Sequence, residues 1–413
     1  MTAMSKLIYR IITCFSRCGR RFAAVLASAA LCGCLLAGCS SSESAGEVSD
    51  PSGSAGEAAA ESDGGDAEEE TAEAVSRESY YFDTICSITV YGMDREAFLT
   101  SGLWEEGESE LTFADAASAA ISDVFALCNE YENLLSKTRE GTDIWNVNHA
   151  AGEAIECDAR TVELVLMGIS YGELSGGAFD ITVGIAADLW DFTSGDANAY
   201  LPDADELAAA VEHVDYTVIE VDEEAGTIRL ADPEAEIDLG GIAKGYIADA
   251  VCERLREVGV TSAIVSLGGN IECVGGKPAV FGFQDEDSET GTFSIGIETP
   301  YSGYTDVVGY SKITDATMVT SGVYERYFTL DGQEYHHILD TETGYPVETD
   351  VLGVTILGEQ GTSGDCDALA TICLIFGSED GLELIQSLDG YEAAFILEDG
   401  SILLTDGMDF TEM

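Results

Sequence analysis

The sequence predicts an α+β fold, with helices concentrated in the first half and a largely antiparallel sheet in the second half. In the first half, apolar residues recur mainly at intervals of three to four, which is the spacing of one helix face. In the second half, short alternating or β-branched runs follow one another, which favours an antiparallel sheet over a doubly wound parallel fold. A length of 413 residues with 46% hydrophobic composition suffices to bury a sizeable core.

The individual elements follow from these patterns in chain order. Asp115 is a suitable N-cap for the first helix, and every predicted helix shows the three-to-four spacing. The predicted helices cover residues 115–135, 159–174, 203–213, 241–258 and 366–376. The predicted strands cover residues 86–92, 216–221, 227–231, 261–267, 292–298, 311–319, 326–330, 335–340, 351–357 and 393–397.

The first 38 residues are typical of a bacterial lipoprotein signal peptide. Basic residues precede an apolar run at 22–38, and the run ends in Leu36-Ala37-Gly38-Cys39, where cleavage would leave Cys39 bearing lipid. A plain signal peptide or a short membrane anchor is the alternative. Residues 39–76 contain eleven acidic residues and no basic ones, which predicts a disordered tether. We therefore expect a domain at 77–413, lipid-anchored to the bacterial cell membrane on its extracytoplasmic side.

The formal net charge of −61 argues strongly against a nucleic-acid partner, because phosphate binding requires clustered cationic side chains. The same acidity makes any Lys or Arg beside an anion site more informative than usual.

The cysteines of the domain show no CxxC pair, and their number is odd. Both features argue against a disulfide framework or a zinc site. We expect small buried hydrophobic residues at positions 86, 128, 157, 252, 273, 366 and 373.

Two glycine pairs mark places where the backbone could approach a ligand. In DLGGIAKGYIADAV, from Asp238, a strand leads through Gly240-Gly241 into a helix, so the first helical amides and Lys244 would form an anion-binding corner. Ordinary turn chemistry is the alternative. In SLGGNIECVGG, from Ser266, apolar runs flank Gly-Gly, which indicates a tight hairpin or a close backbone approach to a ligand.

Two further stretches carry side chains suited to catalysis. His336 and His337 are adjacent in an expected strand, so one should face the core or a cleft. Histidine at a cleft is the usual proton carrier at neutral pH, whereas a satisfied core histidine is the alternative. Asp367 and Thr371 lie four residues apart on one helix face, and their hard oxygen donors suit Mg²⁺. A capping Asp with a Thr bonded to the preceding turn is the alternative.

In combination and in this order, these stretches resemble the FAD:protein FMN transferases, known as the ApbE family. The resemblance covers roughly residues 78–410. The matching stretches are SKTREGTDIWNVN (136–148), SGGAFDITVG (175–184), IDLGGIAKGYIAD (237–249), SLGGNI (266–271), TSGVYERYF (320–328), YHHILDTETGYP (335–346) and DALAT (367–371).

The resemblance implies an ApbE-like, T-fold-related architecture and an enzyme that holds FAD and cleaves its pyrophosphate with Mg²⁺. The FMN half would pass to a Ser or Thr hydroxyl of a partner flavoprotein, and AMP would leave. His337 would be the general base or proton relay, and Lys244 would serve both catalysis and nucleotide binding. The implied flavin-nucleotide contacts are Phe82, Thr138, Ala178, Phe179, Asp180, Asp238, Lys244 and Ile338. The implied metal ligands are Asp367, Thr371 and the Gly241 carbonyl, with Gly364 nearby.

Two stretches depart from the family pattern. The family commonly shows Met-Gly-Thr where this chain has Phe82-Asp83-Thr84, and Ser-x-Tyr where it has Ser136-Lys137-Thr138. Both should lie near the isoalloxazine ring, where Phe82 could replace a lost aromatic contact.

The phosphates of FAD need local positive charge in so acidic a chain. Lys244 and the metal are the expected sources, with Lys312 or Arg326 as additions. No Gly-Ala-Thr or Gly-Ala-Ser, the core of the family's acceptor motif, occurs in the chain, so the acceptor is expected to be another protein. An FAD pyrophosphatase and a non-catalytic flavin-binding lipoprotein are the rival functions. A solute-binding transporter subunit fits less well, because such proteins usually have two α/β lobes.

Overall fold

The computed structural model describes residues 72–104, 111–192, 196, 199–285, 288–303 and 306–413, all of them within one unit that spans Glu70–Met413. The predicted signal peptide at 1–38 and the predicted tether up to residue 71 lie outside the described residues. The first strand begins at Val75, two residues before the expected start of the domain. Among the described residues, no helix is long and apolar enough to cross a membrane.

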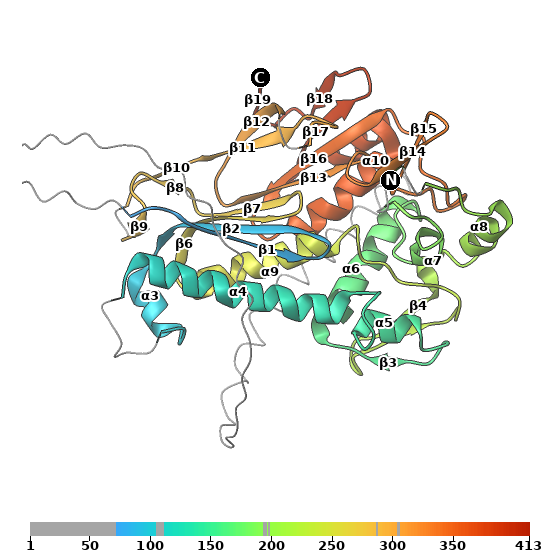
Figure 1. Cartoon of the computed structure of the whole chain (residues 1–413), viewed down its shortest axis with the longest axis horizontal. Helices are drawn as coiled ribbons and strands as arrows, with labels where there is room; N and C mark the ends of the chain where they lie inside the picture. Colours follow the sequence, from blue (N-terminus) through green and yellow to red (C-terminus); the bar gives the residue numbers. More distant parts are fainter. Residues whose placement is uncertain (1–71, 105–110, 193–195, 197–198, 286–287, 304–305) are drawn as a thin grey trace, which may run out of the picture. The chain divides into compact units, whose positions relative to one another are not determined.

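A nine-stranded sheet forms the centre of this unit (Figure 1). Its neighbours pair antiparallel throughout, except that the short β9 (Gly282–Phe283) pairs parallel with β2. The chain-order neighbours β6 and β7 form the hairpin predicted around Gly268-Gly269, whose φ angles of 58° and 95° are those of a two-residue hairpin turn. The strand order is β1 (Val75–Tyr81), β2 (Thr84–Met93), β6 (Val260–Leu267), β7 (Asn270–Val274), β13 (Ala316–Gly322), β16 (Val351–Glu359), β17 (Glu392–Leu397) and β18 (Ile402–Leu404).

Alternation along the strands gives the sheet two apolar faces. On β6, Val265 belongs to the core on one face while Ile264 packs into the cluster on the other. The Val265 face is covered by the helices α4 (Phe113–Leu135), α9 (Ala243–Glu257) and α10 (Ser363–Gln386). The other face is covered by a small sheet of β11 (Phe293–Glu298), β12 (Val307–Ile313) and β19 (Phe410–Glu412).

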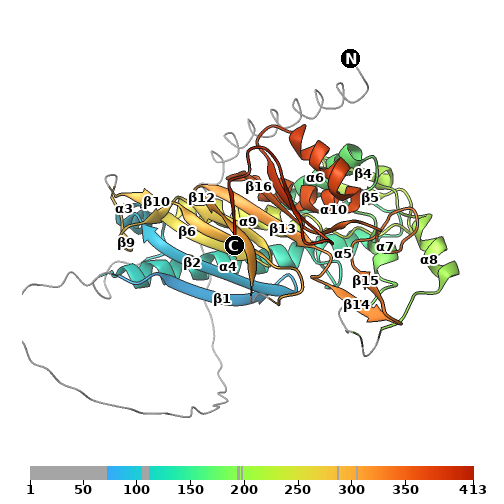
Figure 2. The ribbon, with the colours of Figure 1, turned by 90° about the horizontal axis from the view of Figure 1, so that it is seen from above.

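The remaining elements gather at the two ends of the large sheet, as Figures 1 and 2 both show. At one end, Trp190 and Phe328 form a separate apolar cluster with their neighbours. That end holds α5 (Asp143–Asn148), α6 (Ala159–Ser175), α7 (Gly184–Ala187), α8 (Ala204–Val211), the 3-10 turn η2 (Tyr216–Val218), β3 (Ile155–Glu156), β4 (Ile219–Asp222), β5 (Thr227–Leu230), β14 (Tyr327–Leu330) and β15 (Gln333–His336). The opposite end holds α3 (Arg95–Thr100), β8 (Lys277–Pro278) and β10 (Thr290–Gly291).

The predicted fold class and the five predicted helices are confirmed, although Thr112 and not Asp115 is the N-cap of α4. Three predicted strands differ from the structure. The strand expected at 216–221 begins only at Ile219, because residues 216–218 form the 3-10 turn η2. Residues 311–319 were expected to form a single strand, whereas the chain turns at Asp315, whose φ is 44°. The Asp315 carboxylate accepts the Gly275 amide (2.6 Å), which holds this turn in place. The two halves therefore belong to different sheets, as β12 and β13. The expected strand at 335–340 similarly ends at His336.

The helices α9 and α10 approach each other most closely at Gly245. A Cβ atom built on Gly245 would lie 2.1 Å from the Ser363 carbonyl oxygen and 2.8 Å from the Gly364 Cα. Backbone atoms cannot move aside as a flexible side chain can, so only glycine fits at this crossing.

We expect Gly245→Ala to lower the free energy of unfolding by about 1–3 kcal/mol, the usual cost of overpacking. The gain in helix propensity from Ala, about 1 kcal/mol, is too small to offset that cost. Chemical denaturation measures the difference. Gly291→Ala is the control, because its nearest contact is an ordinary 3.8 Å from Lys277. Equal stability of the two variants would contradict the close approach.

Candidate active site

The glycine corner at 240–241 is held by the carboxylate of Asp238. The Asp238 amide donates to the Ile181 carbonyl (2.7 Å), and Asp238 Oδ1 accepts the Gly240 amide (2.8 Å). The chain then enters α9, whose N-cap residue Ile242 makes no side-chain capping bond. The first turn of α9 therefore begins at a corner that the Asp238 side chain organises, as the sequence predicted only in outline.

Lys137 joins the Asp238 carboxylate to two others. Its ammonium contacts Asp188 and lies 3.3 Å from Asp238 Oδ2 and 3.5 Å from Glu236 Oε1. Burial acts to lower the pKa of Lys137, but the charges of Asp238, Asp188 and Glu236 outweigh it and raise that pKa. The sequence analysis did not single out Lys137 as functional. Nothing in the local sequence shows that residues 188, 236 and 238 converge on it.

Asp367 and Thr371 lie one turn apart on α10, as predicted. The Asp367 side chain is almost fully buried, and its Oδ2 accepts the Gly245 amide (3.0 Å). The Thr371 hydroxyl donates to the Asp367 carbonyl (3.3 Å), which is the bond to the preceding turn that the alternative interpretation described. That bond uses the hydroxyl proton and leaves the oxygen lone pairs available.

Lys244 and Gly241 bring α9 to these two oxygen groups. The Lys244 ammonium lies 3.8 Å from Asp367 Oδ1, the carboxylate oxygen that does not bind Gly245. A Cβ atom on Gly241 would lie 3.6 Å from Thr371 Oγ1. Two segments about 120 residues apart in the sequence therefore form one cluster, which consists of Gly241, Lys244, Asp367 and Thr371.

The loop at 178–180 lies beside this cluster through Phe179. The Phe179 ring covers Gly241, where a Cβ atom would lie 3.0 Å from Phe179 Cε2. Asp180 is buried and accepts the Thr182 amide and hydroxyl (2.8 and 2.7 Å) and the Tyr216 amide (2.7 Å). Burial raises the pKa of Asp180, and these bonds oppose the rise. Asp180 thus shapes the loop that presents Phe179 and the half-buried Ala178.

His337 lies directly after β15 and is oriented by Arg326. Both its amide (3.1 Å) and its Nδ1 (3.2 Å) contact the Arg326 carbonyl. Burial, followed by the positive charge of Arg326, lowers the pKa of His337 to about 3, and Lys244 contributes in the same direction. His337 is therefore neutral at pH 7. The next residue, Ile338, is buried, and its carbonyl accepts the Val347 amide (3.0 Å).

Glu325 is a site residue that the sequence analysis missed. Its Oε1 accepts the Gly322 amide (3.1 Å) within the turn after β13. Glu325 is exposed, so the lost hydration that raises its pKa acts only in part. The charge of Lys244 opposes this rise and that of Asp367 adds to it, so Glu325 belongs to the same group of charges.

The other predicted residues have defined places in the structure. Phe82 lies in the β1–β2 turn at a φ of 54°, and its amide donates to Glu132 (3.0 Å). Thr138 bonds to Ser136 and follows Lys137, which links its segment to Asp238. Their contact with a flavin ring stays a prediction.

Gly364 packs at the helix crossing, and its amide donates to Asp249 Oδ2 (2.9 Å). Lys312 is exposed on β12, in the small sheet. A metal contact of Gly364 and a phosphate contact of Lys312 remain predictions.

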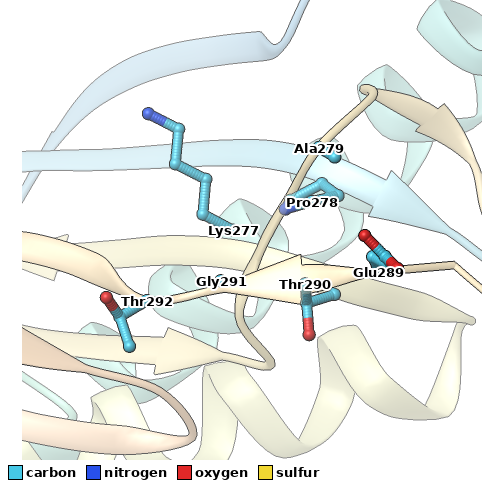
Figure 3. Close-up of a pocket in the computed structure, with 7 residues that line it drawn as sticks. All are labelled: Lys277, Pro278, Ala279, Glu289, Thr290, Gly291 and Thr292. Carbon is cyan, nitrogen blue, oxygen red and sulfur yellow. The ribbon is translucent and has the colours of Figure 1, made fainter.

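A surface hollow between β8 and β10 shares no residue with this cluster (Figure 3). Its two charged side chains, Lys277 and Glu289, point to different sides, so no polar groups converge on a ligand. The lining residues are Lys277, Pro278, Ala279, Glu289, Thr290, Gly291 and Thr292.

Comparison with known families matches residues 82–395 to the ApbE family. The chain belongs to the ApbE family. The match includes every stretch that forms the cluster around Asp367.

Two curated relatives are identical to this chain at about a third of the aligned residues. The FAD:protein FMN transferase of Treponema pallidum is 34% identical over 299 residues, covering 70% of this chain and 80% of the relative. The FAD:protein FMN transferase of Klebsiella pneumoniae is 31% identical over 288 residues, covering 70% and 85%. This chain is accordingly an enzyme of the transferase class.

Solved ApbE structures share the fold. The ApbE protein of Thermotoga maritima superposes with a TM-score of 0.66 at 26% identity, covering 81% of this chain and 97% of the other. The flavinyl transferase ApbE of Pseudomonas stutzeri gives 0.63 at 24% identity, covering 81% and 94%, which supports the fold alone.

The donors around Asp367 fit the magnesium ion that ApbE membership implies. A carboxylate oxygen, a hydroxyl with free lone pairs and the backbone at Gly241 are all hard oxygen donors. Among the described residues, no three His, Cys, Asp or Glu side chains cluster to form a complete metal cage. Mg²⁺ usually keeps water and takes further ligands from phosphate, so the oxygen donors of Asp367 and Thr371 are of a kind that it accepts.

The buried His336 makes stability depend on pH in the acid range. Burial lowers the pKa of His336 to about 4, and its Nδ1 has no hydrogen-bond partner. Below the unfolded pKa of about 6.5 the unfolded chain takes up the proton first, so stability falls from pH 6.5 to pH 4. We expect His336→Gln to remove roughly 3 kcal/mol of this loss, at about 1.4 kcal/mol per pKa unit.

The free energy of unfolding, measured from pH 4 to 7, checks this expectation. His213→Gln is the control. Asp232 raises the pKa of His213, so removing His213 should not reduce the loss of stability at acid pH. An unchanged slope for His336→Gln would show that His336 accepts a proton without cost.

Proposed function

We propose that this chain transfers FMN from FAD to a Ser or Thr hydroxyl of a partner flavoprotein and releases AMP. Asp367, Thr371 and the Gly241 carbonyl would hold Mg²⁺, which when bound supplies positive charge to the pyrophosphate. The curated relatives at 34% and 31% identity carry the name FAD:protein FMN transferase, which supports the flavin donor and the protein acceptor. The metal, the hydroxyl acceptor and the AMP product are the finer parts of the proposal.

The observation that carries the proposal is that the two carboxylate oxygens of Asp367 have different partners. Oδ2 is fixed by the Gly245 amide, while Oδ1 faces the Lys244 ammonium at 3.8 Å. A buried carboxylate with one oxygen anchored and the other beside a lysine is suited to a cation and a phosphate group. Thr371 and Gly241 complete this arrangement.

Positive charge near the cluster accounts for phosphate binding in an acidic protein. The chain has 17 Lys and Arg against 78 Asp and Glu, so a dinucleotide is repelled by most of the molecule. Lys244 offers its charge at the start of α9, where the helix dipole also favours an anion. The charge of Arg326 acts on His337 and would add to the same field.

His337 would accept the proton of the acceptor hydroxyl. A neutral imidazole that donates Nδ1–H to the Arg326 carbonyl has its Nε2 free as the proton acceptor. Burial is the main cause of the pKa of about 3, and the nearby charges of Arg326 and Lys244 lower it further. Bound phosphates would offset those charges and raise this pKa, making His337 a better base when substrate is present.

The reaction balances without a protein nucleophile. The acceptor oxygen forms a bond to the phosphorus of the FMN phosphate, and the bond from that phosphorus to the bridging oxygen breaks. The bridging oxygen leaves with AMP, and the hydroxyl proton goes to His337. Lys244 holds the pyrophosphate and Phe179 shapes the wall beside Gly241, so the protein's main contribution is positioning.

We further propose that lipid on Cys39 anchors the enzyme outside the bacterial cell membrane. The signal sequence at 1–38 and the acidic tether at 39–76 support this location. Such an anchor would place the transferase beside flavoproteins of the cell envelope.

We expect Asp367→Ala to lower AMP release from FAD at least about 100-fold and to abolish Mg²⁺ binding, because the variant lacks the carboxylate ligand. AMP is measured by chromatography and Mg²⁺ binding by calorimetry. Asp365→Asn is the control, since Asp365 lies on the same helix but accepts Tyr171 and Tyr391 instead. Normal turnover in Asp367→Ala would overturn the proposal.

The acceptor step has its own test. The enzyme with FAD, Mg²⁺ and a candidate flavoprotein should leave covalent yellow fluorescence on that protein after denaturing electrophoresis. Omission of Mg²⁺ is the control. Release of free FMN and AMP without labelling of any envelope flavoprotein would identify the chain as a pyrophosphatase instead.

A further inference from the structure

The helices α9 and α10 exchange hydrogen bonds between carboxylates and backbone amides in both directions. Asp367 of α10 accepts the Gly245 amide of α9 (3.0 Å). Asp249 of α9 accepts the amides of Ser363 (2.8 Å) and Gly364 (2.9 Å) at the start of α10. The two backbones meet at Gly245 and Ser363, and each carboxylate lies four residues after its own contact residue. Each helix therefore holds the backbone of the other in place.

The start of α10 depends on Asp249 because it has no cap of its own. Its N-cap residue Thr362 makes no side-chain capping bond, and the Thr362 hydroxyl donates to the Glu359 carbonyl (2.7 Å) instead. The first amides of a helix have no partner within the helix and carry partial positive charge. The Asp249 carboxylate therefore supplies both a hydrogen-bond acceptor and a negative charge to these amides.

Glu272 is a buried neighbour of Asp249. Glu272 of β7 is fully buried, with its Oε1 3.9 Å from Arg256 Nη1. Burial and then the negative charge of Asp249 raise the pKa of Glu272 well above its usual range. Burial also raises the pKa of Asp249, to about 6, while the bonds from the Gly364 and Ser363 amides oppose this rise.

We propose that Asp249 is a positioning residue of the transferase, which sets the register of α10 and thereby the placement of Asp367 and Thr371 against Gly241 and Lys244. The inference rests on the function proposed above. Asp249 itself touches neither substrate nor metal in this proposal.

Asp249 binds the first turn of α10, which lies directly before Asp367. The loss of this contact should therefore act on the metal ligands in particular. Ser363 and Asp367 are one helical turn apart, about 6 Å along the axis, so the first turn moves as a unit. Mg²⁺ requires near-ideal octahedral geometry, and a misplacement of about 1 Å can cost roughly 100-fold in rate. A shift of the helix start would therefore weaken metal binding before it unfolds the domain.

The test replaces Asp249 with Asn, which keeps the shape but removes the charge and one acceptor. We expect the dissociation constant for Mg²⁺ alone, measured by calorimetry, to rise about tenfold or more, as for other residues that orient metal ligands. The KM for Mg²⁺ should rise similarly, with kcat recovering at least in part at high Mg²⁺. The melting temperature is measured on the same samples.

Asp143→Asn is the matched control. Asp143 of α5 similarly accepts the Asp158 amide (2.8 Å) and the Thr161 hydroxyl (2.7 Å), so it too supports the start of another helix, α6. It should lose stability without a change in Mg²⁺ binding. Wild-type Mg²⁺ affinity in Asp249→Asn, with only a lower melting temperature, would overturn the inference.

A second variant covers the case in which Asp249→Asn does not fold. Asp249→Glu keeps the charge but displaces the carboxylate by one methylene group, so it should bind Mg²⁺ with intermediate affinity. Wild-type affinity in this variant would also overturn the inference. If wild-type protein and Asp367→Ala bind Mg²⁺ equally, the proposed function fails instead, which separates the two failures.

Discussion

The close approach of α9 and α10 at Gly245 is the constraint on which the rest of the site depends. Because the backbone of Gly245 touches Ser363 and Gly364, its amide can reach the Asp367 carboxylate. That bond fixes one oxygen of Asp367 and leaves the other beside Lys244. A side chain at position 245 would push the helices apart and break the bond between the Gly245 amide and Asp367. The absence of a Cβ atom at this position is therefore required for the geometry of the site.

The acidity of the chain gives the few cations of the site unusual weight. Lys137 binds three carboxylates around the glycine corner, and Lys244 lies beside Asp367, so both lysines offset local negative charge. Arg326 acts differently, since its carbonyl orients His337 and its charge adds to the burial that lowers the pKa of that imidazole. Lys137, Lys244 and Arg326 therefore supply positive charge around the cluster, in a chain whose acidic surface otherwise repels an anion.

The type of an element was predictable where its apolar periodicity extended over many residues. The position of a break was not predictable where a single turn determined it. The α4 and α6 helices followed from regular apolar spacing over 17 or more residues. The break at Asp315 did not, because its turn is held by a bond to Gly275, 40 residues earlier in the chain. Glu325 was missed for the same reason, since only the fold brings it near Lys244 and Asp367.

The sequence by itself determined the fold class, the family resemblance and the chemical types of the site, because periodicity and short motifs are local properties. The pair of Asp367 and Thr371 on one helix face needed only helical spacing. The tertiary structure alone decided which oxygen of Asp367 is anchored, that Lys137 gathers Asp188, Glu236 and Asp238, and that Asp249 caps α10. These are contacts between residues up to 122 positions apart, which local patterns in the sequence do not specify. The close approach of the backbones at Gly245 accounts for those between α9 and α10.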